Sequence, residues 1–194
     1  MRIHGSLWVG KFLAASLCAA AALLSACGTM NVVAEGGDSN LMLRGNDPVA
    51  YFAGGSATPG RPEIKTRHHG ATYRFASEES RRQFITSPDS YAPQFGGFSA
   101  LAMVNAVPSA ADAAAFKIID GKLYLFENAR ARLYFEMDQE RNLRLATQYW
   151  ESEVRDTGSW QLQAFKRLLW RVPNYKGDAD LAAEYERRFG RPPS

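Results

Sequence analysis

Few side chains in this chain of 194 residues could bind a metal ion or activate a nucleophile. Beyond residue 27 it has no cysteine, and its only two histidines, His68 and His69, are adjacent. Neighbouring residues of a strand point to opposite faces, so we expect this pair not to share one ion. Imidazole and thioether ligands suit copper, which makes His69 a candidate metal ligand, with Met42 or Met103 in support. We therefore predict no cofactor, with a copper-type ion at His69 as the alternative.

Catalysis by a nucleophile has one candidate set, formed by Asp47, His69 and Ser99. These residue types could form a serine–histidine–aspartate triad only if hydrogen bonds joined their side chains. The stretch around Ser99, Gly97-Phe98-Ser99-Ala100-Leu101, lacks the Gly-x-Ser-x-Gly pattern of a nucleophile elbow. We therefore predict no catalytic residue and keep an enzyme as the third alternative.

The first 26 residues have the pattern of a secretion signal. Arg2 and Lys11 carry positive charge, no acidic residue occurs, and an apolar run rich in alanine and leucine extends from Phe12 to Leu24. A run of this length is too short to cross a hydrocarbon core about 30 Å thick as a permanent helix. We expect the segment to be removed.

The stretch Leu24-Ser25-Ala26-Cys27 resembles a bacterial lipobox, in which the cysteine becomes the acylated first residue of the mature protein. The resemblance implies a lipoprotein that carries diacylglycerol and a fatty acyl chain such as palmitate on Cys27. More than one acyl chain gives stable membrane anchoring. Gly28 at the next position resembles the pattern of outer-membrane lipoproteins, so we expect a lipid anchor on the periplasmic side of the outer membrane of a Gram-negative bacterium.

Without residues 1–26 the chain has 168 residues, enough for one hydrophobic core. Two of the 23 basic residues leave with the signal, so 21 basic face 20 acidic side chains. This balance gives no indication of a nucleic-acid partner. With Cys27 acylated the mature chain has neither a free thiol nor an internal disulfide, which leaves its stability to the core.

Composition divides the mature chain into a flexible polar tether over 27–40, a domain over 41–155 and a helical extension over 156–194. Within the domain, two short apolar strands flank Asp120-Gly121, a strong hairpin signal. Ser77 and Asn128 are each placed to cap a following helix. No internal repeat is apparent.

The extension begins with an amphipathic helix. Its apolar face consists of Leu162, Phe165, Leu168, Leu169 and Val172. We expect this face to cover the domain core, with a membrane surface as the alternative, because an apolar face beside a basic one also suits an interface.

Three spaced motifs resemble the YHS domain, a relative of the TRASH metal-binding modules. They are Asp47-Pro48-Val49, then His69 to Phe75, then Phe84 with Pro88-Asp89-Ser90-Tyr91. More loosely, a Gly-Gly-aromatic segment and the hairpin around Asp120 resemble the exported bacterial type. The resemblance implies an α+β fold of small antiparallel hairpins packed with several short helices, followed here by the helical tail.

The metal-binding relatives have cysteines at positions that this chain fills otherwise. By resemblance, those positions are Ala50, Ala76 and Ser80, and the exported type has a further cysteine where Ser99 stands. Neither a methyl group nor a neutral hydroxyl replaces a thiolate toward copper, nickel or zinc. The inherited ligand set is therefore absent.

We expect a lipid-anchored, non-enzymatic binding module of the cell envelope. Its partners would be the membrane, through the N-terminal lipid, and an unidentified protein or small-molecule ligand. The candidate ligand surface consists of Asp47, Tyr51, His69 and Tyr73. The alternative is a periplasmic metal-handling protein of the copper type that uses His69.

Overall fold

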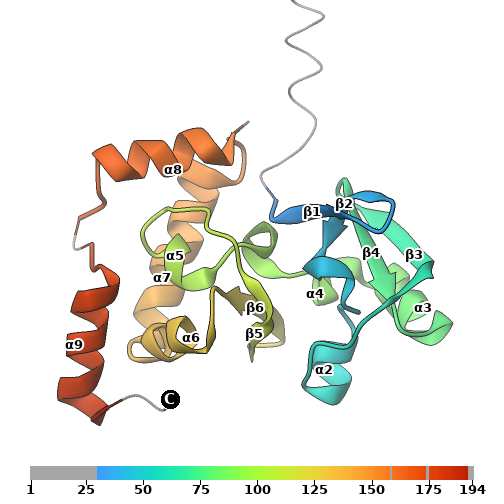
Figure 1. Cartoon of the computed structure of the whole chain (residues 1–194), viewed down its shortest axis with the longest axis horizontal. Helices are drawn as coiled ribbons and strands as arrows, with labels where there is room; N and C mark the ends of the chain where they lie inside the picture. Colours follow the sequence, from blue (N-terminus) through green and yellow to red (C-terminus); the bar gives the residue numbers. More distant parts are fainter. Residues whose placement is uncertain (1–29, 158, 174, 192–194) are drawn as a thin grey trace, which may run out of the picture.

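The computed structural model in Figure 1 describes residues 30–157, 159–173 and 175–191. The signal segment and Cys27 lie outside these residues. Helices and antiparallel-rich sheets are both present, so the predicted α+β class is confirmed.

The first sheet has four strands in the order β1-β2-β4-β3. They are β1 (Val32–Glu35), β2 (Asp38–Met42), β3 (Arg61–His68) and β4 (Ala71–Phe75). The pairs β1–β2 and β3–β4 are antiparallel, and β2 runs parallel to β4 with Leu41 opposite Thr72. The structure therefore places strands at 32–35 and 38–40, in half of the segment predicted as a flexible tether, because Leu41 and Met42 are buried and hold β2 against the core.

Short helices connect this sheet to a second, two-stranded one. Between and after the strands lie η1 (Leu43–Gly45), α2 (Ala50–Gly54), α3 (Glu78–Thr86), α4 (Pro88–Tyr91), η2 (Gln94–Gly97) and α5 (Ala100–Met103). The second sheet is the antiparallel hairpin of β5 (Asp112–Ile119) and β6 (Lys122–Phe126), as its turn signal predicted. Then follow α6 (Ala129–Glu136), α7 (Gln139–Tyr149), the π-helical turn η3 (Trp150–Val154), α8 (Trp160–Leu169) and α9 (Asp178–Phe189).

The chain contains the same backbone unit twice. Leu43, Arg44 and Gly45 have φ of 57°, 51° and 79°, and the three residues Phe95 to Gly97 repeat this run with 54°, 59° and 80°. Each run leads into a short helix, and each short helix is followed by a hairpin. Left-handed φ is uncommon outside glycine, so two such matching runs define one local structure built twice.

The match continues through the hairpins and the helices that follow them. The hairpin turns fall at His69-Gly70 and Asp120-Gly121, with all four residues at positive φ. Ser77 and Asn128 then cap α3 and α6 by accepting from the backbone N–H three residues on, as predicted. The shared aromatic positions keep one spacing, from Tyr73 to Tyr124, from Phe75 to Phe126 and from Phe84 to Phe135. The expectation of no internal repeat was wrong, because few side chains mark the repeated backbone.

Two hydrophobic cores lie on either side of β6. Leu123 and Leu125 point into the core formed with the first sheet, which contains Phe75 and Phe84. The alternate residues Tyr124 and Phe126 pack in the second core, with Phe135 and the α7 residue Ala146. Because successive strand residues face opposite sides, this strand joins the two units into one body.

One buried ion-pair network crosses the first sheet. The Asp38 carboxylate accepts hydrogen bonds from Arg74 Nε at 2.8 Å and from Lys65 Nζ at 2.7 Å. The Arg74 guanidinium also donates to the backbone carbonyls of Glu35 and Gly36 in the β1–β2 turn. The network therefore fixes the N-terminal hairpin to β4.

The prediction for the apolar face of the tail was wrong. Figure 1 shows α8 along one end of the molecule and α9 beside α6. Val172 is buried in the second core. The other four residues of the predicted apolar face, all on α8, are instead exposed: Leu162, Phe165, Leu168 and Leu169. Polar side chains hold the helix on the body, so its apolar face is left outward.

Candidate functional site

Two histidines and one aspartate converge at the turn of the first hairpin. His68 Nε2 lies 2.7 Å from Asp89 Oδ1, and His69 Nε2 lies 3.6 Å from the same oxygen. The two imidazole rings are 3.9 Å apart between centroids. A ligand atom from each of the three residues lies within 4.8 Å of the others. The expectation that the two histidines face opposite sides was therefore wrong.

The physical reason is the backbone conformation of His69. His68 is the last residue of β3, whereas His69 lies in the turn with φ of 47°. This left-handed conformation breaks the alternation of the strand and brings its ring beside that of His68. The Asn40 side chain of β2 donates to the Gly70 carbonyl at 3.3 Å and ties the turn to the neighbouring strand.

Helices α3 and α4 bring the carboxylate to this turn. Phe84 of α3 packs against Tyr73 and lies edge-on to the His68 ring, with centroids 5.9 Å apart. Pro88 then starts α4, and its fixed φ suits the first turn of a helix. Asp89 follows directly, with its side chain 82% exposed, against 76% for His69 and 19% for His68. The cluster thus has one anchored imidazole and two ligands free to adjust.

The cluster lies at the edge of a groove of about 910 Å³ that runs from the first sheet to the second half of the chain. The part of the chain before α3 contributes Met30, Met42 and Tyr73, and the part from β6 onward contributes Lys122, Trp150 and Arg155. The size is within the usual range for a small-molecule site, about 300–1,000 Å³. The groove therefore offers an aromatic and thioether-containing surface next to the three candidate ligands.

The spacing of the cluster is compatible with a coordinated ion. Two ligand atoms at about 2.0–2.1 Å from one metal are about 2.9 Å apart at a right angle and about 3.3 Å apart in a tetrahedron. The separations from Asp89 to the two imidazoles, 2.7 and 3.6 Å, lie on either side of these values. These two separations would need to change by only a few tenths of an ångström to fit one ion, and the exposed side chains of His69 and Asp89 can move by that much.

The electrostatics of the cluster also suit a cation. The hydrogen bond from His68 lowers the pKa of the Asp89 carboxyl below its ordinary value. The carboxylate is then ionised at neutral pH and attracts a cation. Burial raises the pKa of the Tyr73 hydroxyl above its ordinary value, so that this residue contributes a neutral phenol to the groove wall.

The structure does not bring all four residues of the predicted ligand surface together. His69 and Tyr73 line the groove. Tyr51 is buried, with its hydroxyl donating to the Ala113 carbonyl at 2.9 Å. Asp47 is also fully buried, and its carboxylate accepts from the backbone N–H groups of Val49 at 2.8 Å and Ala76 at 2.9 Å. Asp47 and Tyr51 therefore act in packing and backbone bonding.

The candidate triad is not assembled either. The buried Ser99 hydroxyl donates to Glu127 at 2.8 Å and caps α5, while the oxygens of Asp47 bond to backbone N–H groups. His69 has the Asp89 carboxylate beside it instead. Each member thus has partners outside the set.

The three positions that the YHS resemblance aligns with cysteines have structural roles here. The Ala76 N–H is bonded to Asp47, and the Ser80 hydroxyl lies 3.1 Å from that of Ser77 at the start of α3. Ala50 begins α2. Methyl and hydroxyl groups in these places do not fit a thiolate-bound metal.

Asp89 and Met30 were missed as site residues by sequence reasoning. Asp89 belongs to the third motif that resembles the YHS domain. No nearby residue, however, indicates that its side chain would lie beside the hairpin turn twenty residues earlier. Of the two methionines weighed as supporting ligands, Met42 lines the groove, whereas Met103 is buried in the second core.

Comparison of the chain with protein-family models, with curated proteins and with solved structures finds no match in any of the three. Among the described helices, none combines the length and the apolar character needed to cross a bilayer.

Proposed function

We propose that this chain is a lipid-anchored binding protein of the cell envelope whose first hairpin turn holds a transition-metal ion. One observation carries the proposal: ligand atoms of His68, His69 and Asp89 lie within 4.8 Å of one another beside a groove that also contains Met30 and Met42. The three side chains bind and orient the ion, and the groove accommodates any molecule that binds together with the ion.

The donor set favours copper. Two imidazoles and a carboxylate suit divalent first-row ions, and Cu²⁺ binds most tightly among them at a given site. A thioether in reach adds affinity for Cu⁺. The proposed ligands differ from those implied by the YHS resemblance, so metal binding in this chain would depend on imidazole where the relatives use thiolate.

Titration of the chain from residue 28, purified without chelators, with Cu²⁺ tests the metal site. We expect one equivalent to bind with an imidazole signature in its paramagnetic resonance spectrum. His69→Ala and Asp89→Asn each remove a ligand and should weaken binding by at least about tenfold. Binding should also weaken as the pH falls, because protons compete with the metal ion for the imidazole nitrogens.

Asp120→Asn is the matched control, because Asp120 occupies the position of His69 in the second hairpin turn. It should leave the affinity for Cu²⁺ unchanged. Equal affinity in wild type and His69→Ala would exclude this site.

A second candidate function is binding of a small organic molecule or a peptide without a metal. The groove volume and the aromatic side chains of Tyr73, Phe95 and Trp150 favour it. A metal-free protein that still loses ligand binding in Trp150→Ala would support this candidate over the first.

The lipid anchor is supported by the lipobox-like stretch that ends at Cys27. Replacement of Cys27 by alanine should leave an unprocessed precursor. Mass spectrometry of the membrane fraction checks this, and mature acylated protein in the Cys27→Ala strain would contradict the assignment.

A further inference from the structure

Helix α8 is amphipathic, but its apolar face points outward and its polar face packs on the protein. Its exposed face is apolar, with exposed fractions of 71% for Leu162, 58% for Phe165 and 70% for Leu168. Its buried residue is the polar Gln163, which is 5% exposed. Helices on a protein core normally bury their apolar stripe. This helix instead presents that stripe to its surroundings.

Polar contacts fix the helix in this orientation. The Gln163 side chain donates to the Ala106 carbonyl at 3.2 Å in buried surroundings. On the same side, the Arg167 side chain is 11% exposed and pairs with Glu153 of η3, as Lys166 also does. Rotating the helix to bury its leucines would break these contacts, so the outward apolar face is a stable feature of the fold.

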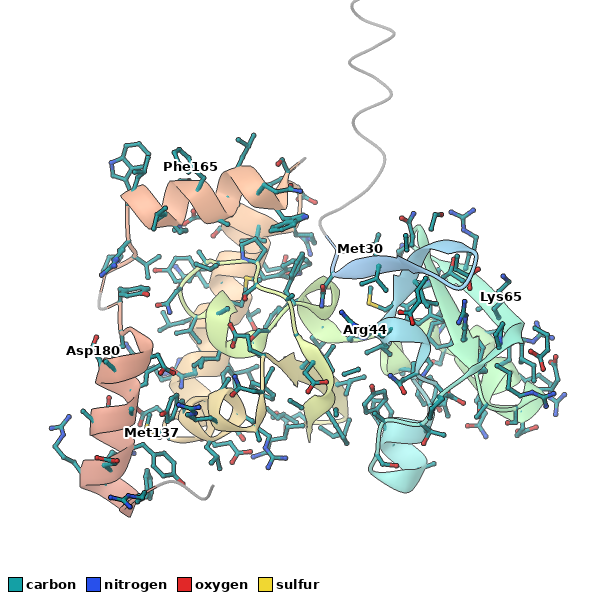
Figure 2. The ribbon with its side chains drawn as sticks, viewed as in Figure 1. Met30, Arg44, Lys65, Met137, Phe165 and Asp180 are labelled. Atoms are coloured by element: carbon teal, nitrogen blue, oxygen red, sulfur yellow. The ribbon has the colours of Figure 1, made fainter. Side chains whose placement is uncertain are left out.

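The apolar face lies toward the end of the molecule where the described chain begins. Figure 2 shows Phe165 on α8 and Met30 toward the same end of the view. Cys27, the proposed acylation site, precedes Met30 by three residues, and three residues span at most about 11 Å. A lipid on Cys27 therefore brings a bilayer close to this end of the body.

We propose that α8 is a membrane-interface helix whose apolar face enters the leaflet that holds the lipid anchor. At ten residues it is about 15 Å long, too short to cross a bilayer and suited to lie in its plane. Trp170 at its C-terminal end is 65% exposed, and tryptophan favours the headgroup region. The inference builds on the lipid anchor of the proposed function and adds a second contact that fixes the orientation of the body.

Contact through α8 is apolar in origin. Lys166 and Arg167 are both paired with Glu153, and the guanidinium of Arg171 lies 4.5 Å above the Tyr175 ring. Basic groups that already have partners within the protein add little attraction to anionic lipids. Binding of α8 to vesicles should therefore depend weakly on salt, unlike that of a polybasic segment.

A fluorescent label at residue 168 tests the proposal on the full mature protein in vesicles of phosphatidylethanolamine and phosphatidylglycerol. The acylated Cys27 does not react with thiol reagents, so Leu168→Cys supplies the labelling site for an environment-sensitive dye. We expect a blue-shifted emission and quenching by iodide at least about threefold weaker than for Arg130→Cys. Arg130 is exposed and belongs to α6, a helix that lies below α8 in the view of Figure 1.

The controls separate this proposal from the lipid anchor. Dye uptake by the protein without an added cysteine would show that Cys27 is unmodified, and so that the anchor fails. Adding Leu162→Gln and Phe165→Gln to the Leu168→Cys protein should restore quenching while Cys27 keeps the protein on the vesicles. Equal quenching at residues 168 and 130 would overturn the membrane contact. Protection that rises with the protein-to-lipid ratio would also overturn it, because a second copy would then cover the face.

Discussion

Replacing Asp47 by alanine should destabilise the fold without affecting the proposed metal site. The Asp47 carboxylate is fully buried and accepts from the backbone N–H groups of Val49 and Ala76. It therefore joins the start of α2 to the end of β4. Alanine removes both acceptors and leaves two backbone donors to find other partners.

The magnitude follows from the surroundings of the two donors. The hydrogen bond to Val49 is buried, and an unsatisfied buried donor costs about 1–3 kcal/mol. Ala76 is only partly buried, so water can replace its partner at a cost of about 1 kcal/mol. We expect a total loss of about 3 kcal/mol in the free energy of unfolding. For a chain of this size that lowers the melting midpoint by about 6–12 °C.

Urea unfolding of the chain from residue 28, followed by circular dichroism, measures this loss. Asp112→Ala is the matched control, because Asp112 accepts from the N–H two residues on, at 2.9 Å, in exposed surroundings. That variant should lose less than about 1 kcal/mol. Equal stabilities of the two variants would refute the assigned role of Asp47. A loss of Cu²⁺ affinity in Asp47→Ala at unchanged stability would instead place this residue in the functional site.

Hydrogen bonds from Lys65 and from Arg74 lower the pKa of the Asp38 carboxyl from its ordinary value of 3.8. The network therefore adds to the free energy of unfolding at pH values above this ordinary pKa, and the contribution is lost as the pH falls toward the folded-state pKa. The urea midpoints of wild type and Asp38→Asn should differ by a constant amount near neutral pH and converge in acid. A second variant, Gly97→Ala, places a Cβ 2.8 Å from the Met42 sulfur at a φ of 80°, whereas Gly121→Ala has a similar φ of 71° and open space. Gly97→Ala should lower the melting midpoint more than Gly121→Ala, and equal midpoints would show that Met42 moves aside freely.

Local signals predicted the parts of the fold that depend on a few neighbouring residues. Asp120-Gly121 supplies the left-handed turn of the second hairpin, and Ser77 and Asn128 supply capping oxygens at two helix starts. These features need no knowledge of distant residues. The predictions that were wrong concern features that depend on tertiary contacts. A helical pattern locates the apolar face of α8, but the orientation of that helix is set by a hydrogen bond from Gln163 to a carbonyl 57 positions earlier.

The candidate site was predicted only in part for a related reason. His69 was singled out by its residue type, but strand periodicity gave the wrong direction for its ring. A non-glycine residue at φ of 47° is uncommon, and nothing in the sequence marks it before the turn is seen. Asp89 reaches the same place through the packing of α3 on the sheet, which involves Phe84 and Tyr73.

The doubled unit has a consequence for how this chain can change. In the second copy, Ile119 and Asp120 occupy the positions of His68 and His69, and Glu140 occupies that of Asp89. One copy keeps the side chains that can hold an ion, while the other supplies β6, the wall shared by both cores. Substitutions at the first turn can therefore alter ligand chemistry while the joint between the halves stays intact. The architecture separates the residues that are free to vary for function from those constrained by stability.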